Sequence, residues 1–122
     1  MPDSIEYRQV SPYLVVADGR AQIEFLEKAF GAKLVFGPLE GDGRLGHTEM
    51  MIGDSKIMFG EPPDGEPMPG MVFIEVSDCD AAFQRMLDAG AEVVMEPMSR
   101  ENDRQAGAKD RNGNQWWVGT SG

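Results

Sequence analysis

The chain has 122 residues, enough for one domain with a real core, and its 41% hydrophobic and 26% charged residues are typical of globular proteins. Its net charge of -10 argues against nucleic acids and anionic membranes as partners, because their phosphates would be repelled. No apolar run approaches the ~20 residues that span a bilayer. The single cysteine, Cys79, cannot form an internal disulfide, so we expect a cytoplasmic protein.

The first half of the chain predicts a strand, a helix and three more strands. After a strand at residues 12–16, Asp18 can accept hydrogen bonds from the free N–H groups at a helix start. Apolar residues at helical spacing follow, and Gly31 can adopt the left-handed conformation that ends a helix. Extended runs then predict strands at residues 34–36, 45–52 and 56–59.

A linker is predicted at residues 61–70, EPPDGEPMPG, because prolines and acidic residues fill it. The same order of elements then recurs. A strand at residues 71–76 leads to Asp78 as a second helix cap, and Gly90 ends the second helix. Further strands are expected at residues 93–95, closing at Pro97, near 107–109 and at 115–118, with Asn112-Gly113 as a hairpin signal before the last.

The whole chain is therefore predicted to be one α+β domain over residues 1–122, built from two tandem β-α-β-β-β modules at about residues 8–60 and 71–120. This order, together with particular motifs, resembles a known family. The motifs are SPYLVV (11–16), FLEKAFGA (25–32), GRLGHTEMMIGD (43–54), VSDCDAAFQRMLDAGAEVVMEP (76–97) and KDRNGNQWW (109–117). The sequence resembles the vicinal oxygen chelate superfamily of glyoxalase I, bleomycin-resistance proteins, fosfomycin-resistance enzymes and extradiol dioxygenases, most of all its small bacterial glyoxalase-like branch.

The resemblance implies a cupped mixed sheet with helices on one face and a ligand on the other. It also implies a homodimer in which modules complete each other's cups. Strand alternation assigns side chains to these faces, because successive side chains point in opposite directions. The apolar parity, expected to face the helices, comprises Leu14, Val16, Met50, Ile52, Ile57, Phe59, Val72, Ile74, Val76, Trp116 and Val118.

The opposite parity mixes aromatic, methionine and polar side chains, as small-molecule sites do. We predict that it binds a ligand. The candidate contacts are Tyr13, His47, Glu49, Met51, Lys56, Met58, Phe73, Glu75, Gln115 and Trp117. In the alternative interpretation some of this face, first of all Met58, Met71 and Phe73, fills a core between the modules.

His47, the only histidine, stands two residues before Glu49 in the segment GHTEMM. Strand geometry separates such Cα atoms by ~6.5–7 Å on one face, so we expect the two side chains to contact one ligand together without a relaxed hydrogen bond between them. As acid and base they could abstract a proton next to a carbonyl. The alternative is a polar patch that orients a ligand or bonds to neighbouring strands.

The resemblance also implies a divalent metal held by the first and last strands of both modules. The matching positions hold Ser11, Met58, Met71 and Trp117. None is a standard ligand for such an ion, so we expect no metal and no other cofactor. A displaced site built from His47, Glu49 and Glu75 is the alternative.

Two functions follow from these expectations. The first is metal-independent binding of a small, largely apolar or cationic molecule, similar to bleomycin-resistance proteins. The second is a lyase, isomerase or dioxygenase that uses a non-standard metal site or acid–base chemistry by His47 and Glu49. The turn Asp110-Arg111-Asn112-Gly113 has Arg where the family usually has Pro, and the loop before it also departs from the family pattern. Ligand identity therefore does not carry over from relatives.

Overall fold

The computed structural model describes residues 9–63 and 65–121 and contains, within them, two helices and ten strands. Module one consists of β1 (Tyr13–Val15), α1 (Gly19–Phe30), β2 (Lys33–Phe36), β3 (Glu40–Gly41), β4 (Arg44–Leu45), β5 (Thr48–Ile52) and β6 (Ser55–Gly60). Module two consists of β7 (Met71–Glu75), α2 (Cys79–Asp88), β8 (Glu92–Arg100), β9 (Asp103–Lys109) and β10 (Gln115–Ser121). The α+β class and the repeated β-α-β-β-β order are confirmed. The predicted limits at residues 1, 8 and 122 lie outside the described residues.

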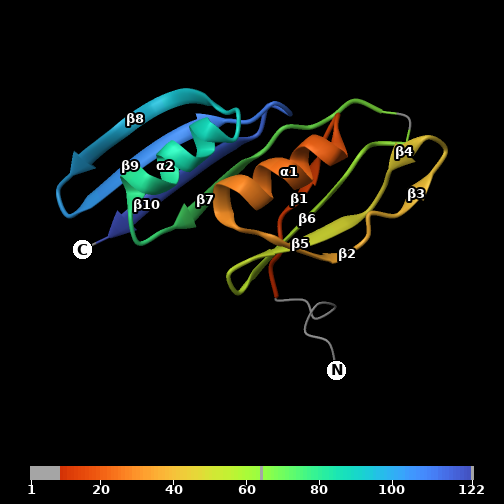
Figure 1. Cartoon of the computed structure of the whole chain (residues 1–122), viewed down its shortest axis with the longest axis horizontal. Coiled ribbons are helices and arrows are strands. Elements are labelled where there is room, and N and C mark those ends of the chain that lie inside the picture. The colour runs from red at the N-terminus through yellow and green to blue at the C-terminus, as the bar shows by residue number, and fades with distance from the viewer. Residues whose placement is uncertain (1–8, 64, 122) are drawn as a thin grey trace.

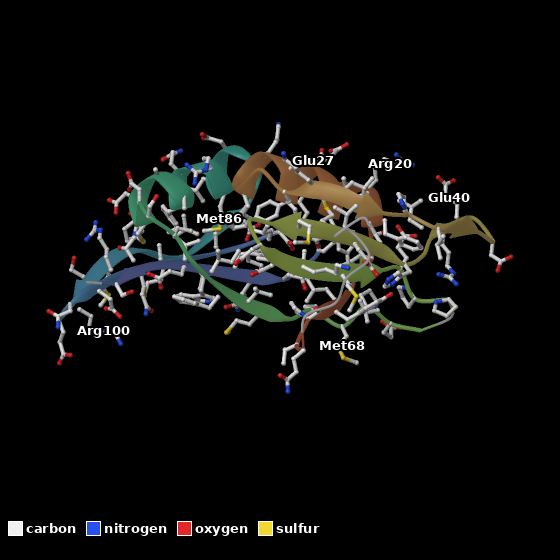
Figure 2. All side chains as sticks on the ribbon, turned by 90° about the horizontal axis from the view of Figure 1, so that it is seen from below. Arg20, Glu27, Glu40, Met68, Met86 and Arg100 are labelled. Carbon is white, nitrogen blue, oxygen red and sulfur yellow. The ribbon has the colours of Figure 1, made fainter. Side chains whose placement is uncertain are left out.

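Each module forms its own four-stranded sheet, ordered β1-β6-β5-β2 and β7-β10-β9-β8. The pairs β1–β6 and β7–β10 are parallel and the other pairs antiparallel, so both sheets are mixed. Both helices lie on the same side of the strands (Figure 1). In Figure 2 Met86 lies between α2 and the strands, whereas Met68 lies on the opposite side, which carries no helix.

Both helices begin where local chemistry predicts, and α1 also ends at the predicted glycine. The C-cap of α2 is Ala89, and the predicted Gly90 follows it with φ of 103°. The side chain of Asp18 accepts a hydrogen bond from Ala21 N at 3.0 Å, and Asp78 does the same for Ala81 N at 3.1 Å. Gly31 ends α1 in the left-handed conformation, with φ of 64°. Neither helix is long and apolar enough to cross a membrane among the described residues.

The helix-facing parity forms the core. Trp116, Phe59 and Met50 are fully buried, while Ile52, Val72, Ile74 and Val76 are partly buried against the same cluster. The core crosses the boundary between the modules, because α1 of module one packs its aromatic rings on β10 of module two. Ring centroids of Phe25 and Phe30 lie 5.9 and 5.7 Å from that of Trp116.

A buried polar network joins α1 to β10 and to the turn that precedes β10. The carboxylate of Asp110, in the β9–β10 turn, accepts hydrogen bonds from Gln22 Nε2 at 2.9 Å and Trp116 Nε1 at 2.8 Å through Oδ2. Its Oδ1 accepts from the backbone of Asn114 at 2.9 Å. Asn112 and Asn114 both donate to Gln22 Oε1. The predicted hairpin turn therefore also fastens module two to α1.

One predicted strand divides into two. Residues 45–52 were expected to form a single strand, but β4 ends at Leu45 and β5 begins at Thr48. The reason is a small hairpin in which Arg44 and Leu45 pair with β3, through a turn where Asp42 and Gly43 have φ of 56° and 74°. His47 consequently stands just before β5 and not within a strand.

Three strands of module two are longer than predicted, and the last of them, β10, extends to Ser121 and not only to residue 118. β8 continues through Pro97 to Arg100, although Pro97 was expected to close it. Proline lacks a backbone donor, but β8 is an edge strand and its register shifts between Met95 and Met98, which are the places where a sheet tolerates proline. Its partner β9 starts at Asp103, before the expected residues 107–109.

Candidate ligand site

A buried ion pair lies in the open face of the module-one sheet, the face that carries no helix. Glu49 Oε1 lies 2.9 Å from Lys56 Nζ, and the two side chains are 2% and 1% exposed. β5 and β6 are antiparallel with Glu49 opposite Met58 and Met51 opposite Lys56, so Glu49 and Lys56 are diagonal neighbours. Pairing compensates two charges that would each be costly to bury alone.

His47 bonds directly to the same carboxylate. Its Nε2 lies 2.7 Å from Glu49 Oε2, so the expectation that strand spacing keeps these side chains apart is wrong. The spacing argument assumed that both residues belong to one regular strand, whereas β5 starts at Thr48. His47 lies outside that strand, and its ring reaches the carboxylate. His47, Glu49 and Lys56 thus form one connected group, which we call the His–Glu–Lys group.

Two aromatic rings pack against the imidazole of His47. Tyr13 stacks on it with ring centroids 5.5 Å apart and planes 18° apart. Phe36 lies at 5.7 Å, tilted by 57°, and pairs with Glu49 in the β2–β5 register. Sequence reasoning missed Phe36, although its position at the end of the predicted strand 34–36 was the available signal. The side chain of His47 remains 29% exposed.

The His–Glu–Lys group connects two hollows in the surface. His47 and Tyr13 line a hollow of about 360 Å³, whose wall is completed by the β3–β4 hairpin. Lys56 lines a larger groove of about 800 Å³ between the modules, together with Phe73 and Glu75 of β7. Glu49 therefore touches one residue of each hollow.

The structure gathers only part of the predicted site. Tyr13, His47, Glu49 and Lys56 come together, and Met51 and Met58 are half-buried on the same sheet. The other four predicted contacts, which belong to module two, are Phe73, Glu75, Gln115 and Trp117.

Hydrogen bonds hold polar members of this second set. Trp117 Nε1 donates to Gln115 Oε1 at 3.0 Å, and Glu75 accepts from the hydroxyl of Ser121 at 2.8 Å. Phe73 and Glu75 line the same groove as Lys56. Gln115 and Trp117 lie in β10, which pairs with β7 and β9, so they belong to the other sheet.

The donors at the family's metal positions do not fit a hard or borderline divalent ion. A hydroxyl, two thioethers and an indole stand there, and Met71 is 67% exposed. The displaced alternative is no better, because Glu75 bonds to Ser121 and both oxygens of Glu49 are engaged by His47 and Lys56. Residues 9–63 and 65–121 contain no group of three or more His, Cys, Asp or Glu placed to hold a metal.

Two mixed sheets, each backed by one helix and open on its other face, define a protein of paired β-α-β-β-β modules. The chain belongs to the Glyoxalase/Bleomycin resistance protein/Dioxygenase superfamily, whose family model matches residues 7–118. This confirms the resemblance seen in the sequence.

The chain is 33% identical to uncharacterized protein Mb0911c of Mycobacterium bovis over 124 residues, covering 90% of this chain and 81% of that protein. It has the same identity to uncharacterized protein Rv0887c of Mycobacterium tuberculosis, with 72% of that protein covered. Among solved structures, TioX from Micromonospora sp. ML1 superposes with a TM-score of 0.78 at 22% identity, covering 93% of this chain and 98% of TioX. These likenesses show the fold, and the names of these proteins specify no ligand for this chain.

Proposed function

We propose that the protein binds a small, largely apolar or cationic molecule on the open face of module one, without a metal ion. The observation that carries this proposal is the His–Glu–Lys group buried in that face. A buried ion pair is weak evidence for stability, because apolar residues of similar volume usually stabilise a fold equally well or better. A charged group in an otherwise apolar and aromatic surface is better explained by recognition of a ligand.

The surroundings favour a flat or positively charged ligand. Tyr13 and Phe36 offer aromatic faces beside the imidazole of His47. Aromatic faces attract flat rings and cations. The net charge of -10 raises the local concentration of cations further.

A double variant separates recognition from stability. Breaking the pair in Lys56→Met alone leaves a buried carboxylate without its cation and should cost about 3–5 kcal/mol of unfolding free energy. Replacing both partners, Glu49→Leu with Lys56→Met, should recover most of that loss. If the group serves binding, the double variant folds well but loses the ligand. A double variant that stays as unstable as the single would show that the pair is needed for the fold.

Ligand binding is tested by thermal shift and calorimetry with defined probes, first metal-free bleomycin and then flat cationic dyes. A probe at a hundred times its Kd should stabilise the protein by ~2.7 kcal/mol. His47→Ala should abolish this shift, whereas Gln84→Ala on the outer surface of α2 should retain it. Equal shifts in both variants would place the binding elsewhere. Stoichiometric nickel, zinc, iron or manganese in protein purified without chelators or a metal-affinity tag would overturn the metal-free proposal.

We further propose a homodimer in which the second copy covers the open faces. The support is apolar exposure: Met71 and Phe73 are 67% and 53% exposed on β7, and Tyr13 is exposed on β1. Large apolar side chains exposed in this way are covered when they form an interface with another protein. Phe73→Asp should convert the dimer to a monomer in sedimentation velocity. A wild-type chain that sediments as a monomer at micromolar concentration would contradict the proposal.

Cytoplasmic location also remains a proposal. It rests on a single cysteine whose side chain is buried, which gives no disulfide within one chain. Fractionation of the source cells, followed by immunoblotting, tests it, and recovery outside the cytoplasm would contradict it.

An enzyme is the second candidate, and the 2.7 Å bond between His47 and Glu49 favours it. A carboxylate that orients a histidine is an arrangement used in general base catalysis. The reaction would be proton abstraction next to a carbonyl. The assay is exchange of such a proton for deuterium in deuterated buffer, monitored by NMR, with α-ketoaldehydes and their thiol adducts as test substrates. Loss of exchange in Glu49→Gln would support catalysis. A wild-type exchange rate equal to the rates of His47→Ala and of buffer alone would contradict it.

A further inference from the structure

We propose that Lys56 is a positioning residue that sets the proton on His47. In this arrangement Lys56 keeps Glu49 ionised, Glu49 keeps the proton of the neutral imidazole on Nε2, and Nδ1 is left as a hydrogen-bond acceptor for the ligand. The site then selects flat molecules that present an N–H or O–H group. This ligand class rests on the proposed binding function, whereas the proton position does not.

The first step concerns the charge of Glu49. Its carboxyl group is buried within the sheet, and burial alone favours the neutral acid. The ammonium of Lys56 at 2.9 Å from Oε1 favours the ionised form instead. The β5–β6 register fixes this geometry, because the two residues are diagonal neighbours on adjacent strands.

The second step concerns the proton of the imidazole. An ionised carboxylate only accepts hydrogen bonds, so the nitrogen that faces it must donate. The atom 2.7 Å from Glu49 Oε2 is Nε2 of His47. A neutral imidazole carries one N–H, so its second nitrogen, Nδ1, becomes an acceptor.

The third step concerns access to the ring. Among the described residues, the hydrogen bond of the ring is made at Nε2, and the side chain is 29% exposed. The ring lines the 360 Å³ hollow beside Tyr13. A flat ligand that stacks there meets an aromatic wall and one acceptor nitrogen.

Other charged groups face the two ends of the His–Glu–Lys group. Arg44, Glu40, Asp42 and Glu61 line the hollow on the side of His47, and Asp54, Glu75 and Arg85 line the groove on the side of Lys56. The carboxylate of Glu61 is already used, because it accepts hydrogen bonds from the backbone of Gly19 and Leu45. Arg44 donates to the backbone carbonyl of Glu61. Among the described residues, Glu49 supplies the carboxylate that bonds to the imidazole.

The single histidine makes the proton position directly measurable. With ¹⁵N-labelled histidine, the two ring nitrogens are observed by NMR without ambiguity, in the absence of ligand and at a pH where the ring is neutral. We expect a protonated Nε2 and an unprotonated Nδ1 in the wild type. In Lys56→Met the His47–Glu49 pair should take up one extra proton, either on the ring or on the carboxyl that then donates to Nε2. Both forms place a proton on Nδ1, so its resonance moves to the protonated type.

Matched variants distinguish positioning from simple support of the fold. Lys28→Met removes an exposed lysine of α1 and should leave both resonances unchanged. Lys56→Arg retains a cation and should keep the wild-type pattern. A wild type with its proton on Nδ1, or a folded Lys56→Met with Nδ1 still unprotonated, would overturn the inference. If Lys56→Met does not fold, the inference is still tested by which ring nitrogen carries the proton in the wild type and in Lys56→Arg.

The ligand class is tested with two neutral probes that differ in one donor. Indole carries an N–H group and 1-methylindole does not. We expect indole to shift the Nδ1 resonance of His47 and 1-methylindole at the same concentration to leave it unchanged. Equal shifts would overturn the donor selectivity. If neither probe shifts the Nδ1 resonance while the proton is still on Nε2, the result would count against the proposed binding face and not against the role of Lys56.

Discussion

Asp110→Ala should be among the most destabilising single substitutions in this chain. The carboxylate of Asp110 accepts three short hydrogen bonds from buried donors, Gln22 Nε2 at 2.9 Å, Trp116 Nε1 at 2.8 Å and the backbone N–H of Asn114 at 2.9 Å. It also accepts a longer one, at 3.5 Å, from Asn114 Nδ2, which donates to Gln22 Oε1 as well. Gln22 and Asn114 are fully buried. Alanine removes both acceptor oxygens and leaves these donors without their partner.

The cost follows from the number of donors. A buried donor left unsatisfied costs about 1–3 kcal/mol, and a water that enters the vacated space recovers part of it. We therefore expect Asp110→Ala to lower the unfolding free energy by about 3–5 kcal/mol, a large part of the ~5–15 kcal/mol of a typical domain. Asp110→Asn keeps one acceptor oxygen and should cost about half as much.

Urea unfolding followed by far-ultraviolet circular dichroism measures this loss without relying on Trp116, whose fluorescence the substitution alters directly. With a slope of about 1–3 kcal/mol per M, the midpoint should fall by about 2 M. Asp88→Ala is the control, because the side chain of Asp88 accepts one exposed hydrogen bond, from Gln84 on the same helix. A loss below about 1 kcal/mol in Asp110→Ala would refute the reasoning, since the three donors would then have found other partners.

Gly107→Ala should displace Trp117, because a Cβ at residue 107 would lie 2.7 Å from the indole. We expect a loss of about 1–3 kcal/mol and an altered near-ultraviolet circular dichroism signal, while Gly41→Ala, with no atom within 4 Å of its new Cβ, should change neither. Burial, reinforced by the charge of Asp80, raises the pKa of the Cys79 thiol above its ordinary value of 9.0. Native protein should therefore react slowly with Ellman's reagent at neutral pH and quickly in urea, and equal rates would contradict this. Because the folded thiol has the higher pKa, its stabilising contribution is present below the ordinary value and is lost as the pH rises through the folded value.

The features that the sequence predicted correctly are those set within a few residues. Asp18 and Asp78 cap helices because their side chains reach N–H groups three residues ahead. Strand alternation placed Trp116 and Phe59 in the core, because the buried face of a sheet repeats every second residue. Helix caps and strand alternation depend on residues close in sequence, so both can be predicted without knowledge of the topology.

The features that the sequence did not predict depend on residues distant in the chain or on the sheet order. Gln22 and Asp110 are 88 residues apart and meet only when module two docks on α1. Pro97 looked like the end of a strand, and it is tolerated because β8 lies at the sheet edge and its register shifts between Met95 and Met98. Phe36 joins His47 through the β2–β5 pairing, which local sequence does not specify.

In the candidate site, the position at which one strand begins changes the chemistry. Alternation alone made His47, Glu49 and Lys56 three independent contacts for a ligand. The β3–β4 hairpin ends at Leu45, so His47 lies outside β5 and its ring reaches the carboxylate of Glu49. Glu49 and Lys56 are then almost completely buried, and His47 becomes the exposed end of the group. Lys56 therefore affects a ligand in the hollow by setting which imidazole nitrogen of His47 carries the proton. Substitutions of these three residues should consequently not have additive effects.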